Sequence, residues 1–196
     1  MAETASPQSP AFESPVVRSY PAGPEGDLTL TDASATAKWL VRASPDGPTA
    51  ARMGTAFGSS SLAPSGALVL GSRPGEWIIV GTPGEVAAAV ADLDGLDSEE
   101  FMTALDWTHS RAMFRVAGAE ATRMLEKVCG IDWSDHMTPD GAVLSASVAL
   151  ATCDLARNDR GEVRSYLIFC DRSFGQYLFD ALIDAGGEFG LAVRAG

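Results

Sequence analysis

The sequence predicts an α+β fold made of two related halves, each of which reads as a ferredoxin-like β-α-β-β-α unit. Strand-length runs of branched and aromatic residues alternate with runs that carry apolar residues at helical spacing. The order of these runs repeats along the chain, and a segment rich in Pro and Ser precedes both copies. We therefore expect an extended or flexible arm over residues 1–26 and a single α+β domain over 27–196, with halves at about 27–97 and 98–196.

The predicted arm holds five prolines together with several Ser and Glu residues. A segment of this composition buries too little apolar surface to offset the cost of ordering the chain. Phe12, Val16, Val17 and Tyr20 are apolar exceptions within it. Two interpretations stay open: the arm lies extended on another surface, such as that of a partner, or it is a disordered tail whose apolar residues are incidental.

The first half is predicted to contain strands at residues 28–32, 37–43, 67–71 and 76–82, and helices at 49–57 and 85–93. Gly54 weakens the first helix, and Gly58 stands where a C-terminal cap would end it. Residues 59–61, all Ser, read as a flexible connection. Pro83 suits the start of the second helix, because the N–H that proline lacks would be unpaired there.

The second half is predicted to contain strands at residues 110–117, 143–155, 163–171 and 188–193, and helices at 119–128 and 174–185. Gly118 closes the first strand at a turn, and Gly130 stands where a left-handed cap would end the helix that follows. Ser173 is the expected N-cap of the last helix, whose apolar residues share one face.

The repeat is visible in a few residue identities as well as in the order of elements. Asp32 aligns with Asp106, and the strand at 76–81 aligns with the strand at 165–170. Each of the two later strands is followed by a helix. Because the identities are few, the order of the elements carries the prediction that the halves share a sheet or pack face to face.

The charge balance argues against polyanionic partners. The chain carries 26 acidic and 14 basic residues, a formal net charge of -12. Nucleic acid and anionic membranes are therefore not expected to bind. No run approaches the roughly 18 to 20 apolar residues of a membrane span. The N-terminus lacks the pattern of a secretory signal, so we expect a cytoplasmic protein.

The cysteine pattern predicts neither a zinc site nor a disulfide framework. The three cysteines, Cys129, Cys153 and Cys170, are widely spaced, and no CxxC pair occurs. Only two histidines are present to complete a metal site. Free, mostly buried thiols in a reducing cytosol are the simpler interpretation.

The candidate chemical residues favour structural roles. His109 and His136 have no nucleophile or metal partner in sequence, so a turn side chain is favoured over a general base. Asp32 and Asp106 could orient a ligand, but their repetition favours carboxylates that cap turns. Gly118 lies between a strand and a helix without any nucleotide-binding pattern.

Three aspartates, Asp132, Asp135 and Asp140, lie in one predicted loop. Carboxylates at such spacing can hold calcium, but the ligand pattern of an EF-hand is missing, so a solvated loop is favoured. We therefore assign no catalytic, cofactor-binding or metal-ligating residue to this chain.

Arginines gather in the second half of this acidic chain. They stand near aromatic residues, which favours a protein interface over ordinary surface charge. The arginines are Arg111, Arg115, Arg123, Arg157, Arg160, Arg164 and Arg172, and the aromatic residues are Trp107, Phe114, Trp133, Tyr166 and Phe174.

Several short motifs together carry a family resemblance, which is better after residue 100 and covers roughly residues 28–194. They are Asp-Trp-Thr-His-Ser-Arg at 106–111, Gly-Ala-Glu-Ala-Thr-Arg-Met-Leu at 118–125, Cys-Gly-Ile-Asp at 129–132, the strand at 166–170, and Arg-Ser-Phe at 172–174 leading into 182–190. With these motifs the chain resembles the gamma subunit of heterotetrameric sarcosine oxidase. The arm lies outside the resemblance.

The resemblance implies a domain similar to the folate-binding aminomethyltransferase domains. It implies a non-catalytic subunit that assembles with alpha, beta and delta subunits into an oxidoreductase, which oxidatively demethylates sarcosine to glycine. FAD, FMN, NAD, zinc and tetrahydrofolate are expected on the other subunits and none on this chain. The alternatives are a free-standing folate-binding or aminomethyltransferase-like protein and a small-ligand-binding ferredoxin-like module.

Overall fold

The computed structural model describes residues 11–21, 27–96 and 100–194. The strands are β1 (Thr29–Asp32), β2 (Ala37–Arg42), β3 (Ser60–Leu62), β4 (Leu68–Arg73), β5 (Glu76–Gly81), β6 (Thr103–Asp106), β7 (Arg111–Ala117), β8 (Val143–Val148), β9 (Ala151–Arg157), β10 (Ser165–Asp171) and β11 (Ala192–Arg194). The helices are α1 (Pro48–Met53), α2 (Pro83–Ala91), α3 (Ala121–Glu126) and α4 (Gly175–Gly186), with 3-10 turns η1 (Arg172–Phe174) and η2 (Gly187–Phe189). The predicted α+β class is confirmed.

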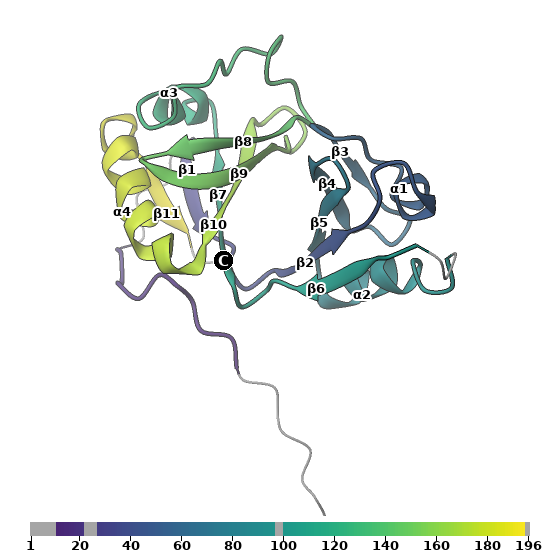
Figure 1. Ribbon diagram of the computed structural model, residues 1–196. Helices are drawn as coiled ribbons and strands as arrows, with labels where there is room; N and C mark the ends of the chain where they lie inside the picture. The colour runs from purple at the N-terminus through teal and green to yellow at the C-terminus, as the bar shows by residue number, and fades with distance from the viewer. Residues whose placement is uncertain (1–10, 22–26, 97–99, 195–196) are drawn as a thin grey trace, which may run out of the picture.

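The strands form two sheets, seen side by side in Figure 1. The first sheet has the order β3-β4-β5-β2-β6, and the second has the order β11-β1-β7-β10-β9-β8. Neighbouring strands are antiparallel except for β1 and β11, which are parallel. Antiparallel pairing therefore predominates in both sheets, as expected for an α+β fold.

Each half of the chain gives its leading strand to the sheet of the other half. β1 precedes β2 in sequence but pairs with β7 in the second sheet. β6 precedes β7 but pairs with β2 in the first sheet. The expected division near residue 97 separates the two sequence repeats, whereas each sheet draws strands from both sides of it.

The two sheets face each other across a shared apolar layer. Leu40 and Ile78 of the first sheet pack in one buried cluster with Phe169 of the second. The layer has a polar end, where Arg73 of β4 donates to the carboxylate of Asp154 on β9 over 3.3 Å. The sheets are therefore joined by an apolar core and an ion pair as well as by the exchanged strands.

The helices cover the outer faces of the sheets, α1 and α2 on the first and α3 and α4 on the second (Figure 1). Among the described residues, the cluster under α3 and α4 contains 21 buried hydrophobic residues, and the cluster under α1 and α2 contains 9. The second half therefore has much the larger core of its own.

Two predicted helix ends are wrong. α1 ends at Met53, because Gly54 takes the left-handed conformation (φ 60°) that closes the helix, so Gly58 is not its cap. α3 ends at Glu126, and its cap residue Lys127 stays right-handed. Gly130 does not have a positive φ, so the left-handed cap expected there is absent.

Among the described residues, the first half contains one more strand than predicted, and the second half contains two more, of which one is β6. Residues 143–155 were expected to form a single strand, but the chain turns back at Ala149 and Leu150, whose φ angles are 46° and 69°. The result is the hairpin of β8 and β9. In the first half, the connection expected at 59–61 is the short strand β3, which pairs with β4. The Ser60 amide also donates to the Gly141 carbonyl of the second half over 2.8 Å.

The last helix begins differently from the prediction. Ser173 lies inside η1, and the carboxylate of Asp171 caps that turn by accepting from the Ser173 amide over 2.9 Å. The predicted last strand at 188–193 is shifted, because η2 occupies its first residues and β11 follows. The edge position of this strand is confirmed.

Candidate functional site

Asp32 and Asp106 end the two exchanged strands in the same way. The Asp32 carboxylate accepts from the Ser34 amide over 3.0 Å, and the Asp106 carboxylate accepts from the Thr108 amide over 2.8 Å. Each aspartate thus fixes the turn that leads its strand out of one sheet and into the other. The prediction that these residues cap turns is confirmed.

Lys38 lies fully buried beside these turns. Its Nζ donates to the carbonyls of Ser34 and Thr36, both over 2.7 Å. Burial lowers the pKa of Lys38 to about 8, against the opposing effect of the carboxylates of Asp32 and Asp106. The amine has no access to solvent, so its role is structural. It holds the turn by which the chain passes from one sheet to the other.

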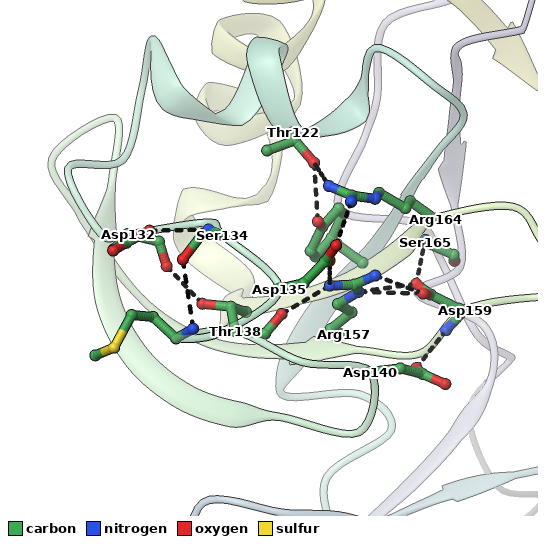
Figure 2. A network of polar contacts seen from close by, with 12 residues as sticks. Thr122, Asp132, Ser134, Asp135, Thr138, Asp140, Arg157, Asp159, Arg164 and Ser165 are labelled. Carbon is green, nitrogen blue, oxygen red and sulfur yellow. Dashed lines mark hydrogen bonds and ion pairs between the residues drawn. The ribbon is translucent and has the colours of Figure 1, made fainter.

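A polar network centred on Arg157 joins four charged side chains through three ion pairs (Figure 2). Its guanidinium, with only 7% of the side chain exposed, donates to Asp159 over 2.8 Å and to Asp135 over 2.5 Å. It also donates to the Thr138 carbonyl over 2.8 Å. The hydrogen bonds that Arg157 donates to Asp159 and, to a smaller extent, to Asp135 raise the pKa of Arg157.

The network extends to Arg164, which donates to Asp135 over 2.8 Å, as Figure 2 shows. Asp140 accepts from the Asp159 amide over 2.9 Å. Asp132 accepts from the Ser134 amide instead, so the three loop aspartates do not converge. In the described residues no group of three His, Cys, Asp or Glu side chains is placed to hold a metal. The network fastens the loop before β8 to strands β9 and β10.

Arg115 pairs with neutral groups, and no ion pair with a carboxylate is formed by it among the described residues. Its guanidinium donates to Ser165 Oγ over 2.6 Å and to the Asn158 side chain over 3.3 Å. Burial, and secondly the charge of Arg160, lower its pKa to about 10. Neutral acceptors within the chain satisfy this side chain.

The aromatic residues expected at an interface are mostly internal. Phe114, Trp133 and Tyr166 are buried in the core of the second half. Trp107 carries Arg111 over its ring at 4.4 Å, and Phe174 is 49% exposed. Phe114, Trp133 and Tyr166 are therefore core residues, and the arginine and aromatic interface expected on the second half stays a prediction.

The two histidines are exposed, and His136 directly follows the network residue Asp135. The His109 ring is 5.5 Å from the ring of Phe12 in the N-terminal arm. The three cysteines are free and buried, as predicted. Burial raises the pKa of Cys153 and of Cys170 to about 12, so their thiols stay protonated and unreactive.

The described part of the arm, residues 11–21, lies on the chain itself. The side-chain oxygen of Gln176 in α4 accepts from the amides of Val17 and Arg18 over 2.8 and 3.1 Å. Arg18 also pairs with Asp180 over 2.7 Å. Helix α4 therefore holds Val17 and Arg18 of the arm, while Ser14 bonds to Asp32 of β1. Residues 1–10 and 22–26 lie outside the described structure.

A groove separates the two helices of the first half. It encloses about 330 Å³ and is walled by apolar residues that include Met53, Leu62 and Leu93. Arg52 and Asp92 form an ion pair of 3.5 Å across it. The helices of the second half are instead tied together, because Lys127, next to α3, donates to the Ala185 carbonyl of α4 over 3.0 Å.

The structure resembles two solved structures over most of its length. A chain of the heterotetrameric sarcosine oxidase from Corynebacterium sp. U-96 in complex with pyrrole 2-carboxylate superimposes with a TM-score of 0.71 and 24% identity, over 87% of this chain and 90% of that chain. The glycine cleavage system aminomethyltransferase T from Bartonella henselae superimposes with a TM-score of 0.60 and 14% identity, over 86% of this chain and 48% of that chain. This chain has the fold that they share. It spans about half the length of the aminomethyltransferase.

No family model matches the sequence, and no curated protein is similar to it in sequence. The likeness therefore lies in the fold, at identities that leave function open. In the described residues no helix is long and apolar enough to cross a membrane.

Sequence reasoning missed Lys38 and the Arg157 network. Lys38 stands in a strand next to polar turns, where a lysine normally faces solvent. Arg157 was noted only as one of many arginines. A signal for the network was present, since Asn158, Asp159 and Asp140 surround it in sequence or in the neighbouring turn.

Proposed function

We propose that this chain is a non-catalytic gamma subunit of a heterotetrameric sarcosine oxidase. The observation that carries the proposal is the extent of the match. The chain covers 90% of one chain of a sarcosine oxidase complex, with a TM-score of 0.71. It covers only 48% of the aminomethyltransferase, whose remaining length has no counterpart here.

The proposal assigns this chain to assembly. The buried charged groups of the described residues, Lys38, Glu76, Asp154 and Arg157, all have partners in the same chain. The partners would be alpha, beta and delta subunits, and FAD, FMN, NAD, zinc and tetrahydrofolate would be held by those subunits. The complex would be cytoplasmic and would oxidise sarcosine or a related N-methyl amine.

Copurification tests the proposal. The chain is coexpressed with the flavin-bearing chains encoded nearest to it, and an affinity tag is placed on a flavin-bearing chain. The expected result is coelution at fixed stoichiometry, with N-methyl amine oxidation that depends on the presence of this chain. Separate elution of a stable, monomeric chain would contradict the proposal.

The shared fold with the aminomethyltransferase favours a second candidate, a free-standing folate-binding protein. Tetrahydrofolate binding by the isolated chain, measured by calorimetry, distinguishes the two. The proposed subunit role predicts no stoichiometric folate or flavin binding by the chain alone. A folate complex of the isolated chain would favour the second candidate.

A further inference from the structure

The two exchanged strands occupy equivalent positions but have different neighbours. β1 is the outer strand of the antiparallel pair with β7, and β6 is the outer strand of the antiparallel pair with β2. The far side of β1 is covered by β11, which runs parallel to it. The far side of β6 is the end of the first sheet. The second sheet therefore has a sixth strand at a position where the first sheet has none.

The backbone pairing shows which groups of β6 are left at this edge. The Trp107 amide donates to the Lys38 carbonyl over 2.7 Å, so in an antiparallel ladder the alternate residues Leu105 and Thr103 also face β2. The N–H and C=O groups of Ala104 and Asp106 consequently point away from the sheet. No backbone partner for them occurs in the described residues.

The same alternation holds in the second sheet, where the edge is covered. The Ala192 amide donates to the Leu28 carbonyl over 2.9 Å, so the even-numbered residues of β1 face β11. Leu30 and Asp32 then correspond to Ala104 and Asp106. The repeat thus shows what fits such an edge: a short extended segment that runs parallel to the exchanged strand.

The β6 edge is short, with four residues, and ends in the charged Asp106, but it lacks the other features that protect an edge strand. Its sequence, Thr-Ala-Leu-Asp, contains no Pro or Lys, and its pairing with β2 has no bulge. Phe101 is 85% exposed and Leu105 is 50% exposed, and their spacing of four places them on the same side of an extended chain. An added strand would therefore gain apolar contacts as well as backbone hydrogen bonds.

The charge of the segment that precedes β6 in sequence favours one kind of strand. Residues 92–100 contain five carboxylates and no basic residue. A second copy of this chain would bring the same negative run to the edge, which opposes self-association. β11, which covers the equivalent edge, supplies the sequence Ala-Val-Arg.

We propose that β6 is a docking edge that accepts a parallel, extended segment from a partner chain, with small or branched apolar residues and at least one basic residue. This inference deepens the proposed function and rests on it for the identity of the partner, which would be another subunit of the same complex. The occupied state has six strands in each sheet.

The first test uses a peptide and does not depend on the proposed function. The probe is the hexapeptide Gly-Leu-Ala-Val-Arg-Ala, which reproduces residues 190–195, titrated into the isotope-labelled full chain. The expected result is a set of amide shifts confined to residues 101–107. The same peptide with Glu in place of Arg is expected to bind at least tenfold more weakly. Shifts elsewhere, or none up to millimolar peptide, would overturn the inference.

Ala104→Pro removes one outward N–H while it keeps the bonds to β2, and proline is tolerated on an edge strand. It is expected to weaken peptide binding at least tenfold. Ala104→Val keeps the N–H and serves as the matched control, with circular dichroism to check that both variants fold. Equal binding by the wild type and a folded Ala104→Pro variant would also count against the docking edge.

The second test uses the copurified complex. The amides of Ala104 and Asp106 are expected to exchange with solvent at least a hundredfold more slowly in the complex than in the free chain. If the complex forms and these amides exchange as in the free chain, the docking edge is refuted and the subunit role stands. If no complex forms, the subunit role fails, and the peptide titration alone decides whether β6 accepts a strand.

Discussion

The two halves of this chain share an order of elements but differ in how completely each covers itself. In the second half, α3 and α4 are tied together, and 21 described hydrophobic residues are buried beneath them. In the first half, a groove of about 330 Å³ lies between α1 and α2, and 9 are buried. The difference indicates that a repeated fold need not divide its stability equally, so one half can keep open surface for contacts.

Gly118 gives the largest expected effect, because it joins the second half to the exchanged strand β1. Its φ is 133°, and a β-carbon there would lie 1.6 Å from the Asp27 carbonyl oxygen. Gly118→Ala is expected to cost at least about 4 kcal/mol of unfolding free energy, or to prevent folding. Urea unfolding measures the loss.

Gly84→Ala is the control for this substitution. A β-carbon at Gly84 has no heavy atom within 4 Å, and the residue lies at the start of α2. The control is expected to change stability by less than about 1 kcal/mol. Similar losses in both variants would mean that the close approach at Gly118 is not what limits substitution.

Leucine truncations compare the two cores directly. Leu182 of α4 is fully buried in the larger cluster, and Leu93 lies in the smaller cluster at the wall of the groove. Leu182→Ala is expected to cost about 3 to 5 kcal/mol, and Leu93→Ala about 2 kcal/mol, because the groove wall can relax. Urea unfolding of both variants checks the order. A larger loss at Leu93 would reverse the comparison.

The pH dependence of stability tests whether Lys38 is buried where the chain passes between the two sheets. Its pKa is lowered by burial from 10.5 to about 8, so between these values the unfolded chain still binds a proton that the folded chain has released. Stability from this group therefore rises as the pH increases through that window. The free energy of unfolding of the wild type, relative to Lys38→Met, is expected to rise by about 2 to 3 kcal/mol between pH 7 and pH 10.5.

The free energy of unfolding is compared between the wild type and Lys38→Met because the buried cysteines contribute to its pH dependence in both proteins. Cys153 and Cys170 have raised pKa values, which lower the stability of both proteins as the pH increases above 9. Their contribution cancels in the comparison. A difference that is flat with pH would show that the Lys38 amine is not desolvated.

The arm is expected to give the smallest effect. Deleting residues 1–21 removes the hydrogen bonds from Val17 and Arg18 to Gln176, both of which lie at an exposed surface. The expected loss is about 1 to 2 kcal/mol in urea unfolding. Deleting residues 1–10 is the matched control and is expected to leave stability unchanged. An equal loss in both would place the stabilising contacts outside residues 11–21.

The sequence was informative wherever a local rule decided the structure. Gly118 marked a real turn, and the aligned pair Asp32 and Asp106 marked two equivalent ones. It was uninformative where a non-turn residue took an unusual conformation, as at Ala149 and Leu150, since neither residue type signals a left-handed turn.

Non-local features were also out of reach. The strand exchange depends on pairing between residues about eighty positions apart, which no periodic pattern encodes. The candidate site could not be predicted from the sequence for the same reason. The β6 edge becomes visible only when its neighbours are known, and Lys38 is recognised as buried only when both sheets are in place.

The exchange of β1 and β6 has a consequence for the order in which a growing chain is completed. β1 is made before every strand of the first sheet, yet its partners β7 and β11 are made much later. The first sheet needs nothing beyond β6 and can close while the second is still being synthesised. During that interval β1 has no strand partner, and its parallel neighbour β11 is made after all the other strands of the second sheet.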